Sequence, residues 1–357
     1  MSKLYIRSIL AIAFSLLSYV CSAHPSWGIV VGQDGNIYYV DVMHHGDGGL
    51  CRINPSSNKL EVIQDNLHAH YLQVDNNGIL WAAADLWHEG EIEGEGHHYL
   101  VKCDPSTNII DTVFFTDDED VFFGNNFAVD GKNGVVYFTI HNKIFANDFR
   151  GQTTQVIDHE FGWINTFNTD QQGNIWITDK QKDNGTLYQW NKEEGLNAYA
   201  ANLLQEPIAD PIFKEANHHR LYAIGFDVDG SPLLCDNATR TIRKIGPSGV
   251  IDTVYKSPDS WHPIGIYTYN GRYYVMETGW NKKGHLGPKI IILDESFNKT
   301  EEIIINATTK TIRKITASKN SPQEGTQRKS MLVPAISGSL IIILLVSVIR
   351  QRKRKHK

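Results

Sequence analysis

The sequence has few cysteines and lacks the short motifs that mark common hydrolases and nucleotide-binding enzymes. Four cysteines occur in 357 residues, and Cys51, Cys103 and Cys235 remain once the leader described below is removed. Three widely spaced cysteines indicate neither a disulfide framework nor a zinc knuckle. Cys51 and Cys103 could form one bridge, or both could stay as free buried thiols. No Gly-x-Ser-x-Gly, His-Glu-x-x-His or phosphate-binding loop occurs between residues 24 and 330.

Positive charge is scarce in the body of the chain. The formal net charge of −6 divides into +2 for residues 1–23, +6 for residues 350–357 and therefore −14 for the segment between them. Binding to a nucleic-acid backbone requires clustered lysine and arginine. The composition therefore excludes nucleic acid as a partner.

Both ends of the chain carry export signals. Lys3 and Arg7 precede an apolar run and small residues up to residue 23, which predicts a secretory signal peptide. Residues 331–349 contain no charge and are long enough to cross a hydrocarbon core of about 30 Å at about 1.5 Å per residue. The basic segment 350–357 follows directly, which marks the cytoplasmic side. We expect an exported single-pass membrane protein with a polar linker at residues 318–330; whether the tail is processed stays open.

A short pattern recurs six times between the leader and the linker. Each copy has a strand, a turn with glycine, and a second strand rich in aromatic and β-branched residues, as in GIVVGQDGNIYYVD. The turn glycines are spaced about 47 residues apart on average: Gly35, Gly78, Gly134, Gly173, Gly230 and Gly271. A weaker second hairpin follows most copies, and helical periodicity is almost absent. The pattern predicts that residues 24–317 form an all-β, six-bladed β-propeller.

Two stretches resemble known propeller families. DNATRTIRKIGPSGVIDTVY, residues 236–255, resembles an NHL repeat, and HPSWGIVVGQDGNIYYVD with LCRINP resembles the opening blade of the senescence-marker-protein and gluconolactonase propellers. The second resemblance implies a divalent cation at the channel mouth, held by acidic and amide side chains. His24-Pro25-Ser26 stands where that family has Glu-Gly-Pro, and the family's catalytic acid has no counterpart in ANHHRLYAIGF.

Histidines are distributed to one side of the predicted blades. In an up-and-down blade, the start of the first strand and the loop between the second and third strands lie at one end, called the top here. Fourteen of the 15 histidines fall at these places, and His356 in the tail is the exception: His24, His44, His45, His68, His70, His88, His97, His98, His141, His159, His218, His219, His262 and His285. The clustering predicts a shared site at the top.

A metal site is one interpretation of this clustering. His24, His70 and His262 lie near the starts of three first strands, and Asn126 and Asn165 lie at two others. Imidazole ligands favour zinc over calcium.

Further residues would line the mouth around such a metal. We expect His68, Trp163, His218 and His219 to contact the ligand.

Two functional classes remain open at this stage. A metal-dependent hydrolase of the lactonase or esterase kind, or a lyase, would use the cation to polarise a carbonyl oxygen and a histidine as base. Alternatively, the chain is a non-catalytic NHL-type binding or scaffold propeller for a small-molecule, carbohydrate or protein partner. The substrate, the oligomeric state and the presence of catalysis are not determined by the sequence.

Overall fold

The computed structural model describes most of the region between the leader and the linker. The described ranges are residues 26–42, 48–86, 97–118, 121–122, 127–130, 133–150, 152–206, 220–281, 284–306 and 309–316. The predicted signal peptide, linker, span and tail lie outside them. Within the described ranges, no helix is long and apolar enough to cross a membrane.

Three antiparallel sheets have four strands each, in sequence order. The first contains β5 (His68–Val74), β6 (Leu80–Leu86), β7 (His97–Asp104) and β8 (Ile109–Thr116). The second contains β14 (Ile164–Thr169), β15 (Ile175–Asp179), β16 (Thr186–Asn191) and β17 (Gly195–Ala200), with the short 3₁₀ helix η1 (Lys182–Asn184) between β15 and β16. The third contains β18 (Leu221–Phe226), β19 (Pro232–Asp236), β20 (Thr241–Ile245) and β21 (Ile251–Lys256).

A fourth sheet has a divided innermost strand. It consists of β9 (Val121–Phe122), β10 (Ala128–Asp130), β11 (Val135–Ile140), β12 (Lys143–Asn147) and β13 (Thr153–Gln155). Both β9 and β10 pair with β11, at Thr139↔Phe122 and at Ala128↔Tyr137. Residues 123–126, which separate the two pieces, lie outside the described residues.

The remaining strands form one nine-stranded sheet made of two parts. The first part is β1 (Ile29–Val31), β2 (Ile37–Asp41), β3 (Gly49–Asn54) and β4 (Lys59–Asp65). The second part is β22 (Trp261–Tyr269), β23 (Arg272–Asn281), β24 (Gly284–Leu293), β25 (Lys299–Asn306) and β26 (Thr311–Thr316). A single residue pair, Thr311↔Lys59, joins β26 to β4.

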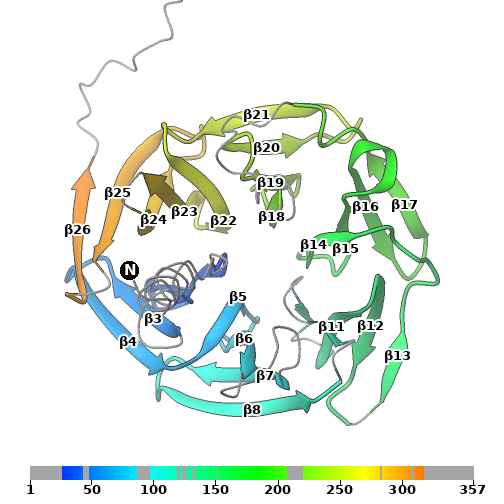
Figure 1. Ribbon diagram of the computed structural model, residues 1–357, viewed down its shortest axis with the longest axis horizontal. Helices are drawn as coiled ribbons and strands as arrows, with labels where there is room; N and C mark the ends of the chain where they lie inside the picture. The colour runs from blue at the N-terminus through cyan, green and yellow to red at the C-terminus, as the bar shows by residue number, and fades with distance from the viewer. Residues whose placement is uncertain are drawn as a thin grey trace, which may run out of the picture. The chain divides into compact units, whose positions relative to one another are not determined.

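The sheets are arranged in a ring (Figure 1). Their innermost strands contact one another in the cyclic order β1, β5, β10, β14, β18, β22 and back to β1. The outer strands lie on the circumference, where β8 and β21 are the outermost strands of their sheets. The chain is therefore all-β with the arrangement of a propeller, as the repeat predicts.

The glycine turns have the backbone conformation that the sequence predicts. All six turn glycines have a positive φ, between 63° at Gly134 and 87° at Gly173. L-residues with side chains rarely adopt this conformation, whereas glycine does so without steric cost. Each turn joins the innermost strand of its sheet to the second strand, so all six lie at the same end of the sheets, the end opposite to the top.

An aspartate stabilises this turn in two of the four-stranded sheets by the same contacts. The Oδ1 atom of Asp75 accepts the backbone N–H of Asn77 and Ile79, and its Oδ2 atom accepts the indole N–H of Trp81 at 3.1 Å. Asp170 accepts the indole N–H of Trp176 at 2.8 Å in the same way. A carboxylate that joins a turn to the next strand fixes the register of the hairpin, since both oxygens are used.

Buried apolar residues from neighbouring sheets form the core. Second strands such as β2, β15 and β19 are buried along their whole length, because they pack between two neighbouring sheets. Cys51, Cys103 and Cys235 are all buried and free, which agrees with the free-thiol alternative. Burial raises the pKa of the Cys51 thiol to about 12 and that of Cys103 to about 11, so both thiols are unreactive at neutral pH.

Candidate functional site

The innermost strands share an irregularity near the top end. Four of them contain a bulge at the same position: between Ala69 and Tyr71 in β5, Ile164 and Thr166 in β14, Leu221 and Ala223 in β18, and Pro263 and Gly265 in β22. In each case one extra residue has no partner on the second strand, and these residues are His70, Asn165, Tyr222 and Ile264. Bulges redirect a side chain and are frequent beside functional sites.

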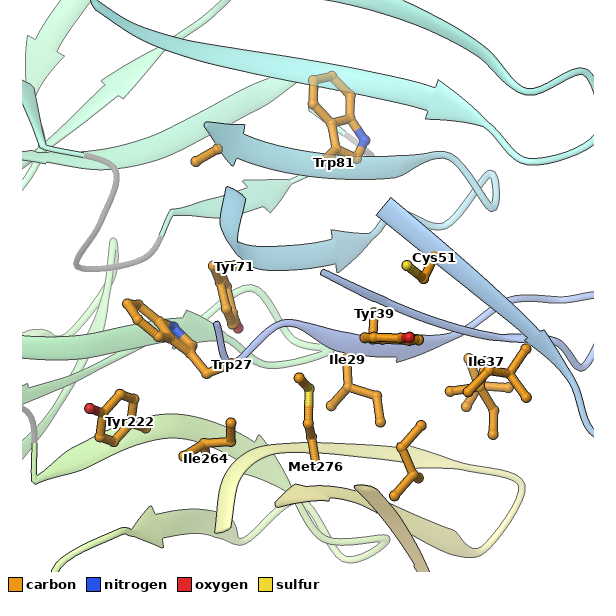
Figure 2. Close-up of a cluster of buried hydrophobic side chains, with 14 of the residues drawn as sticks. Trp27, Ile29, Ile37, Tyr39, Cys51, Tyr71, Trp81, Tyr222, Ile264 and Met276 are labelled. Carbon is orange, nitrogen blue, oxygen red and sulfur yellow. The ribbon is translucent and has the colours of Figure 1, made fainter. Parts of the chain in front are cut away.

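Three of the four bulge residues gather around Trp27, which precedes β1. The Trp27 indole stacks on the His70 imidazole, with ring centroids 5.3 Å apart. The indole also makes an edge contact with Tyr222, with ring centroids 5.4 Å apart. Figure 2 shows Tyr222 and Ile264 beside Trp27. Trp27 thus connects the β5 sheet with the β18 sheet. We call Trp27, His70, Asn165, Tyr222 and Ile264 the bulge ring.

The bulge ring is packed. Trp27 is 6% exposed, Tyr222 7% and Ile264 1%, while His70 is half-buried. The innermost strands come very close here: a Cβ on Gly28 would lie 2.3 Å from the backbone nitrogen of Leu72, and one on Gly265 would lie 2.3 Å from the Trp27 carbonyl oxygen. Glycine is required at both positions because the neighbouring atoms belong to the backbone.

Amide side chains connect the innermost strands further along towards the glycine turns. The Gln73 side chain donates to Asn168 Oδ1 at 2.8 Å and accepts the backbone N–H of Val129 at 2.8 Å. The Asn168 side chain in turn donates to the Ile224 carbonyl at 2.8 Å. These bonds join β5, β10, β14 and β18 across the interior of the ring. The interior of the ring below the bulge residues is therefore packed.

Acidic residues lie at the top ends of the second strands and are committed to the fold. The Asp179 carboxylate accepts the backbone N–H groups of Gly162, Trp163 and Gln181. Asp236 is fully buried and accepts hydrogen bonds from the Arg220 guanidinium at 3.1 Å. Buried carboxylates are retained when charge and hydrogen bonds compensate their desolvation. Asp179 therefore holds the segment before β14 against the end of β15, and Asp236 holds the segment before β18 against the end of β19.

Glu277 of β23 is a third buried acid at this end. Its carboxylate accepts the Tyr255 hydroxyl at 2.9 Å and the Ser257 hydroxyl at 2.5 Å, and lies 3.0 Å from the Lys289 ammonium. The Lys289 ammonium also lies 4.2 Å from the centre of the Trp261 ring. Burial, and then the negative charge of Glu277, raise the pKa of the Tyr255 hydroxyl well above its usual range. The phenol therefore serves as a hydrogen-bond donor.

The structure brings some of the predicted site residues together. His68 and His70 are neighbours, with ring centroids 4.9 Å apart, and both are half-buried. Trp163 is half-buried at the start of β14. His24, Asn126, His218 and His219 lie outside the described residues, so their predicted roles stay predictions.

Two other predicted residues are tied to the backbone. Asn165 Oδ1 accepts the backbone N–H of Leu221 at 3.3 Å, and the residue is 4% exposed. His262 is 1% exposed, and its Nδ1 lies 2.8 Å from the carbonyl oxygen of Asn237. A carbonyl can only accept, so Nδ1 carries the proton and Nε2 has the lone pair in the neutral ring. In the register of the innermost strands, Ile264 rather than His262 occupies the position equivalent to His70.

Among the described residues, no three histidine, cysteine, aspartate or glutamate side chains are close enough together to hold a metal ion. The predicted set of His24, His70 and His262 includes one residue outside those ranges, so the zinc site stays a prediction. The orientation of His262 would suit a zinc ligand, because its Nδ1–H donates to the Asn237 carbonyl. Metal-binding histidines donate their second ring N–H to a carbonyl or carboxylate, which orients the ligating nitrogen.

Basic side chains lie at the top of the β14 and β18 sheets, beside the buried acids Asp179 and Asp236. Lys180 follows β15, and its ammonium lies 5.1 Å from the centre of the Trp163 ring. Burial lowers the pKa of Lys180, and the charge of Arg220 lowers it further. Deeper in, the Arg243 guanidinium lies 2.9 Å from Asp236, so two buried arginines share one carboxylate.

A shallow hollow of about 300 Å³ lies at the opposite end of the β1–β4 part. Its lining is polar: Asn36, Arg52, Asn54, Ser57, Lys59 and Glu61. Arg52 donates to Glu61 at 2.9 Å and to the Pro105 carbonyl at 3.0 Å, so its charge serves to join two sheets. The hollow is remote from the histidines, and we assign no site to it.

Comparison with known proteins supports the fold. No protein-family model matches the chain, and no curated protein matches its sequence. A solved chain of the nidogen/laminin complex aligns with a TM-score of 0.54 at 12% identity, covering 78% of this chain and 95% of that one. A protein of unknown function from Bacteroides thetaiotaomicron aligns with a TM-score of 0.53 at 13% identity, covering 72% and 68%. At these identities the likeness concerns the fold alone.

Proposed function

We propose that the chain is a six-bladed, NHL-type propeller that binds a ligand at its top end without catalysing a reaction. Each of the six innermost strands of the ring begins one blade. The β1–β4 and β22–β26 parts of the large sheet count as two blades, because only a single residue pair joins them. A single observation carries the functional part. The carboxylates of Asp179, Asp236 and Glu277 are committed to internal hydrogen bonds or ion pairs, whereas aromatic and imidazole groups are half-buried at the same end.

A binding surface of this composition suits a ligand with flat apolar faces and polar edges. His68, His70 and Trp163 offer ring faces together with ring N–H groups or lone pairs. The other members of the bulge ring and the Gln73–Asn168 hydrogen bond close the interior beneath them. The ligand would therefore rest on the top surface, where a carbohydrate or a protein loop has room to extend.

Replacement of His70 by alanine is expected to weaken ligand binding by about two- to tenfold. The substitution removes the ring that stacks on Trp27 and the polar edge beside His68, and an aromatic contact of this kind contributes about 0.5–1.5 kcal/mol. The affinity of each variant for neutral and acidic oligosaccharides on a glycan array measures the effect. Gln172→Ala is the control, because Gln172 is exposed in a glycine turn at the opposite end of the sheets. Equal binding by both variants would place the ligand elsewhere.

A metal-dependent hydrolase or lyase is the second candidate, and the orientation of His262 favours it. In that case His24, His70 and His262, with Asn126 and Asn165 nearby, would hold a divalent ion, more suitably zinc than calcium. Such an ion supplies a Lewis acid for a carbonyl oxygen. Elemental analysis of the protein purified without chelators separates the candidates. About one metal ion per chain, lost in His262→Gln, favours the enzyme; a metal-free protein that still binds oligosaccharides on the array favours the binding propeller.

We also propose that the propeller is exported and held outside the cytoplasm by residues 331–349, with residues 350–357 inside. The basis is the charge asymmetry around an uncharged stretch of membrane length. Protease added to intact cells should digest the propeller. An epitope tag at the C-terminus should still be detected, on a short fragment that the membrane protects. A propeller that resists digestion until the cells are lysed would contradict both the orientation and the signal peptide.

A further inference from the structure

The outer strands of the ring, β4, β8, β13, β17, β21 and β26, differ in how their edges are protected. β13 is only three residues long, and β4, β8, β17 and β21 each contain a bulge. The extra residues of these bulges have no partner on the third strand of their sheet: Ile63, Val113, Tyr199 and Val254. Short edge strands and bulges are two ways in which sheets avoid association through an open edge.

β26 has neither feature. Its six residues pair with β25 without interruption, from Asn306↔Thr311 to Glu301↔Thr316. On its other side, Thr311↔Lys59 is the one pairing to a described strand, and Figure 1 shows β26 on the circumference, outside β25. The outer edge of residues 312–316, called the open edge here, therefore presents backbone N–H and C=O groups to which an extended chain can add.

The side chains of β26 combine apolar and cationic groups. Ile312 packs against the core, whereas Arg313 and Ile315 are exposed, Ile315 by 43%. Successive side chains of a strand point to opposite faces of the sheet, so Arg313 and Ile315 share the outer face. A strand added at the open edge would meet an arginine and an isoleucine two positions apart.

The positive charge at the open edge is not neutralised by acids. Arg313, Lys310 and Lys59 are exposed, and none of them forms an ion pair within the described part of the chain. All three lie within two residues of the Thr311↔Lys59 pair. The neighbouring acids are already paired with other cations: Glu61 with Arg52 at 2.9 Å, Glu301 with Lys314 at 2.6 Å, and Glu302 with Lys299 at 3.0 Å. The three unpaired cations therefore attract an anionic group from outside.

Charge also decides which extended chain fits the open edge. A second β26 would bring like charges together across the two strands, which destabilises their pairing. Between residues 318 and 330, the linker of this chain has Lys319, Arg328 and Lys329 against one acid, Glu324. Both of these basic segments are poor occupants, so an acidic segment of a partner protein is favoured.

We propose that the open edge binds an extended acidic segment of a partner protein as an additional strand. The backbone groups of residues 312–316 would form the ladder, Arg313 would pair with a carboxylate on the same face, and Ile315 would contact an apolar side chain two positions along. This interaction surface lies on the circumference. It is separate from the ligand site proposed at the top, so either can fail without the other.

Calorimetric titration of the full chain in detergent micelles tests the inference with three synthetic peptides: the acidic EVTETVE, the basic KVTKTVK, and EVTETVE with a methyl group on every peptide nitrogen. We expect EVTETVE to bind at least about tenfold more tightly than KVTKTVK, because opposite charges favour a strand pair and like charges oppose it. The methylated peptide should lose at least about tenfold as well, because it keeps the charges but has no backbone N–H to donate.

Three results of this titration would overturn the inference. Equal binding of EVTETVE and its methylated form would mean that charge alone attracts the peptide, without an added strand. Failure of EVTETVE to bind, or equal binding of the acidic and basic peptides, would remove the proposed partner chemistry. Binding of glycerol phosphate in place of the peptides would assign the cations to anionic lipid headgroups.

Charge reversal of the arginine locates the contact. Arg313→Glu should lose about five- to tenfold in affinity for EVTETVE and gain affinity for KVTKTVK. Lys256→Glu is the matched control, because Lys256 is also an exposed cation on an outer strand, but β21 carries the bulge at Val254. This control should bind EVTETVE as the wild type does. Unchanged affinity in Arg313→Glu, or an equal loss in Lys256→Glu, would contradict strand addition at β26.

Discussion

Asp236→Asn should destabilise the protein by about 3–5 kcal/mol, because it removes the buried carboxylate that two buried guanidinium groups share. Asp236 is fully buried, and its carboxylate lies 3.1 Å from Arg220 Nε and 2.9 Å from Arg243 Nη2. Burial lowers the pKa of Arg243, and the charge of Asp236 opposes that effect. Asparagine has nearly the same shape, so the substitution tests charge rather than volume. Equilibrium unfolding in urea, followed by tryptophan fluorescence, measures the loss.

A second aspartate provides the control for Asp236. Asp259 also pairs with an arginine, Arg240, at 2.7 Å, but its side chain is 97% exposed. Exposed ion pairs contribute about 0–1 kcal/mol, so Asp259→Asn should leave the unfolding midpoint almost unchanged. Equal midpoints for the two variants would mean that another group neutralises the arginines when Asp236 is removed.

Gly28→Ala should cost about 3 kcal/mol, at the upper end of the range for overpacking. The new methyl carbon would lie 2.3 Å from the Leu72 nitrogen and 2.8 Å from the Tyr71 carbonyl carbon. These are backbone atoms of β5, so the strand itself would have to move. Gly28 also donates to the His70 carbonyl at 3.2 Å, and the shift would therefore displace the Trp27–His70 stack. We expect reduced stability together with weaker ligand binding.

Gly246→Ala is the matched control for this substitution. A Cβ there would meet its nearest atom, the Val250 carbonyl oxygen, at 3.7 Å, which is an ordinary contact. Alanine should be neutral or stabilise the protein by about 0.4–1 kcal/mol by restricting the unfolded chain. If Gly28→Ala unfolds at the same denaturant concentration as Gly246→Ala, the close approach of β1 to β5 does not contribute to the free energy of unfolding.

The repeat could be predicted from sequence because its signals are local. A glycine turn such as Gly78 or Gly173 between two apolar strands specifies a hairpin within about 15 residues. The aspartate–tryptophan contact has an equally local signal, which the glycine pattern does not contain: Asp75 and Trp81 are six residues apart, as are Asp170 and Trp176.

The site was harder to predict because it depends on register. A bulge shifts which side chain reaches the interior, and no residue type marks its position. His262 and His70 look equivalent in the sequence, yet the bulge in β22 places Ile264 where β5 has His70. Trp27 packs between the β5 and β18 sheets at the centre of the bulge ring, and the sequence does not show which strands it contacts. The commitment of Asn165 to the Leu221 backbone depends on a contact between sheets that sequence spacing does not reveal.

The position of β26 has a mechanical consequence. This strand pairs with β25 over six residues, from Asn306↔Thr311 to Glu301↔Thr316, but with β4 at one residue. A pull at Thr316 directed across the strand and away from β25 would load these pairs one after another, so the strand would peel away at a lower tension than it would shear. The innermost strands β1 and β22, packed at Gly265 and Trp27, would still hold the ring shut. β26 would thus act as an extensible tether that yields before the load reaches the ring.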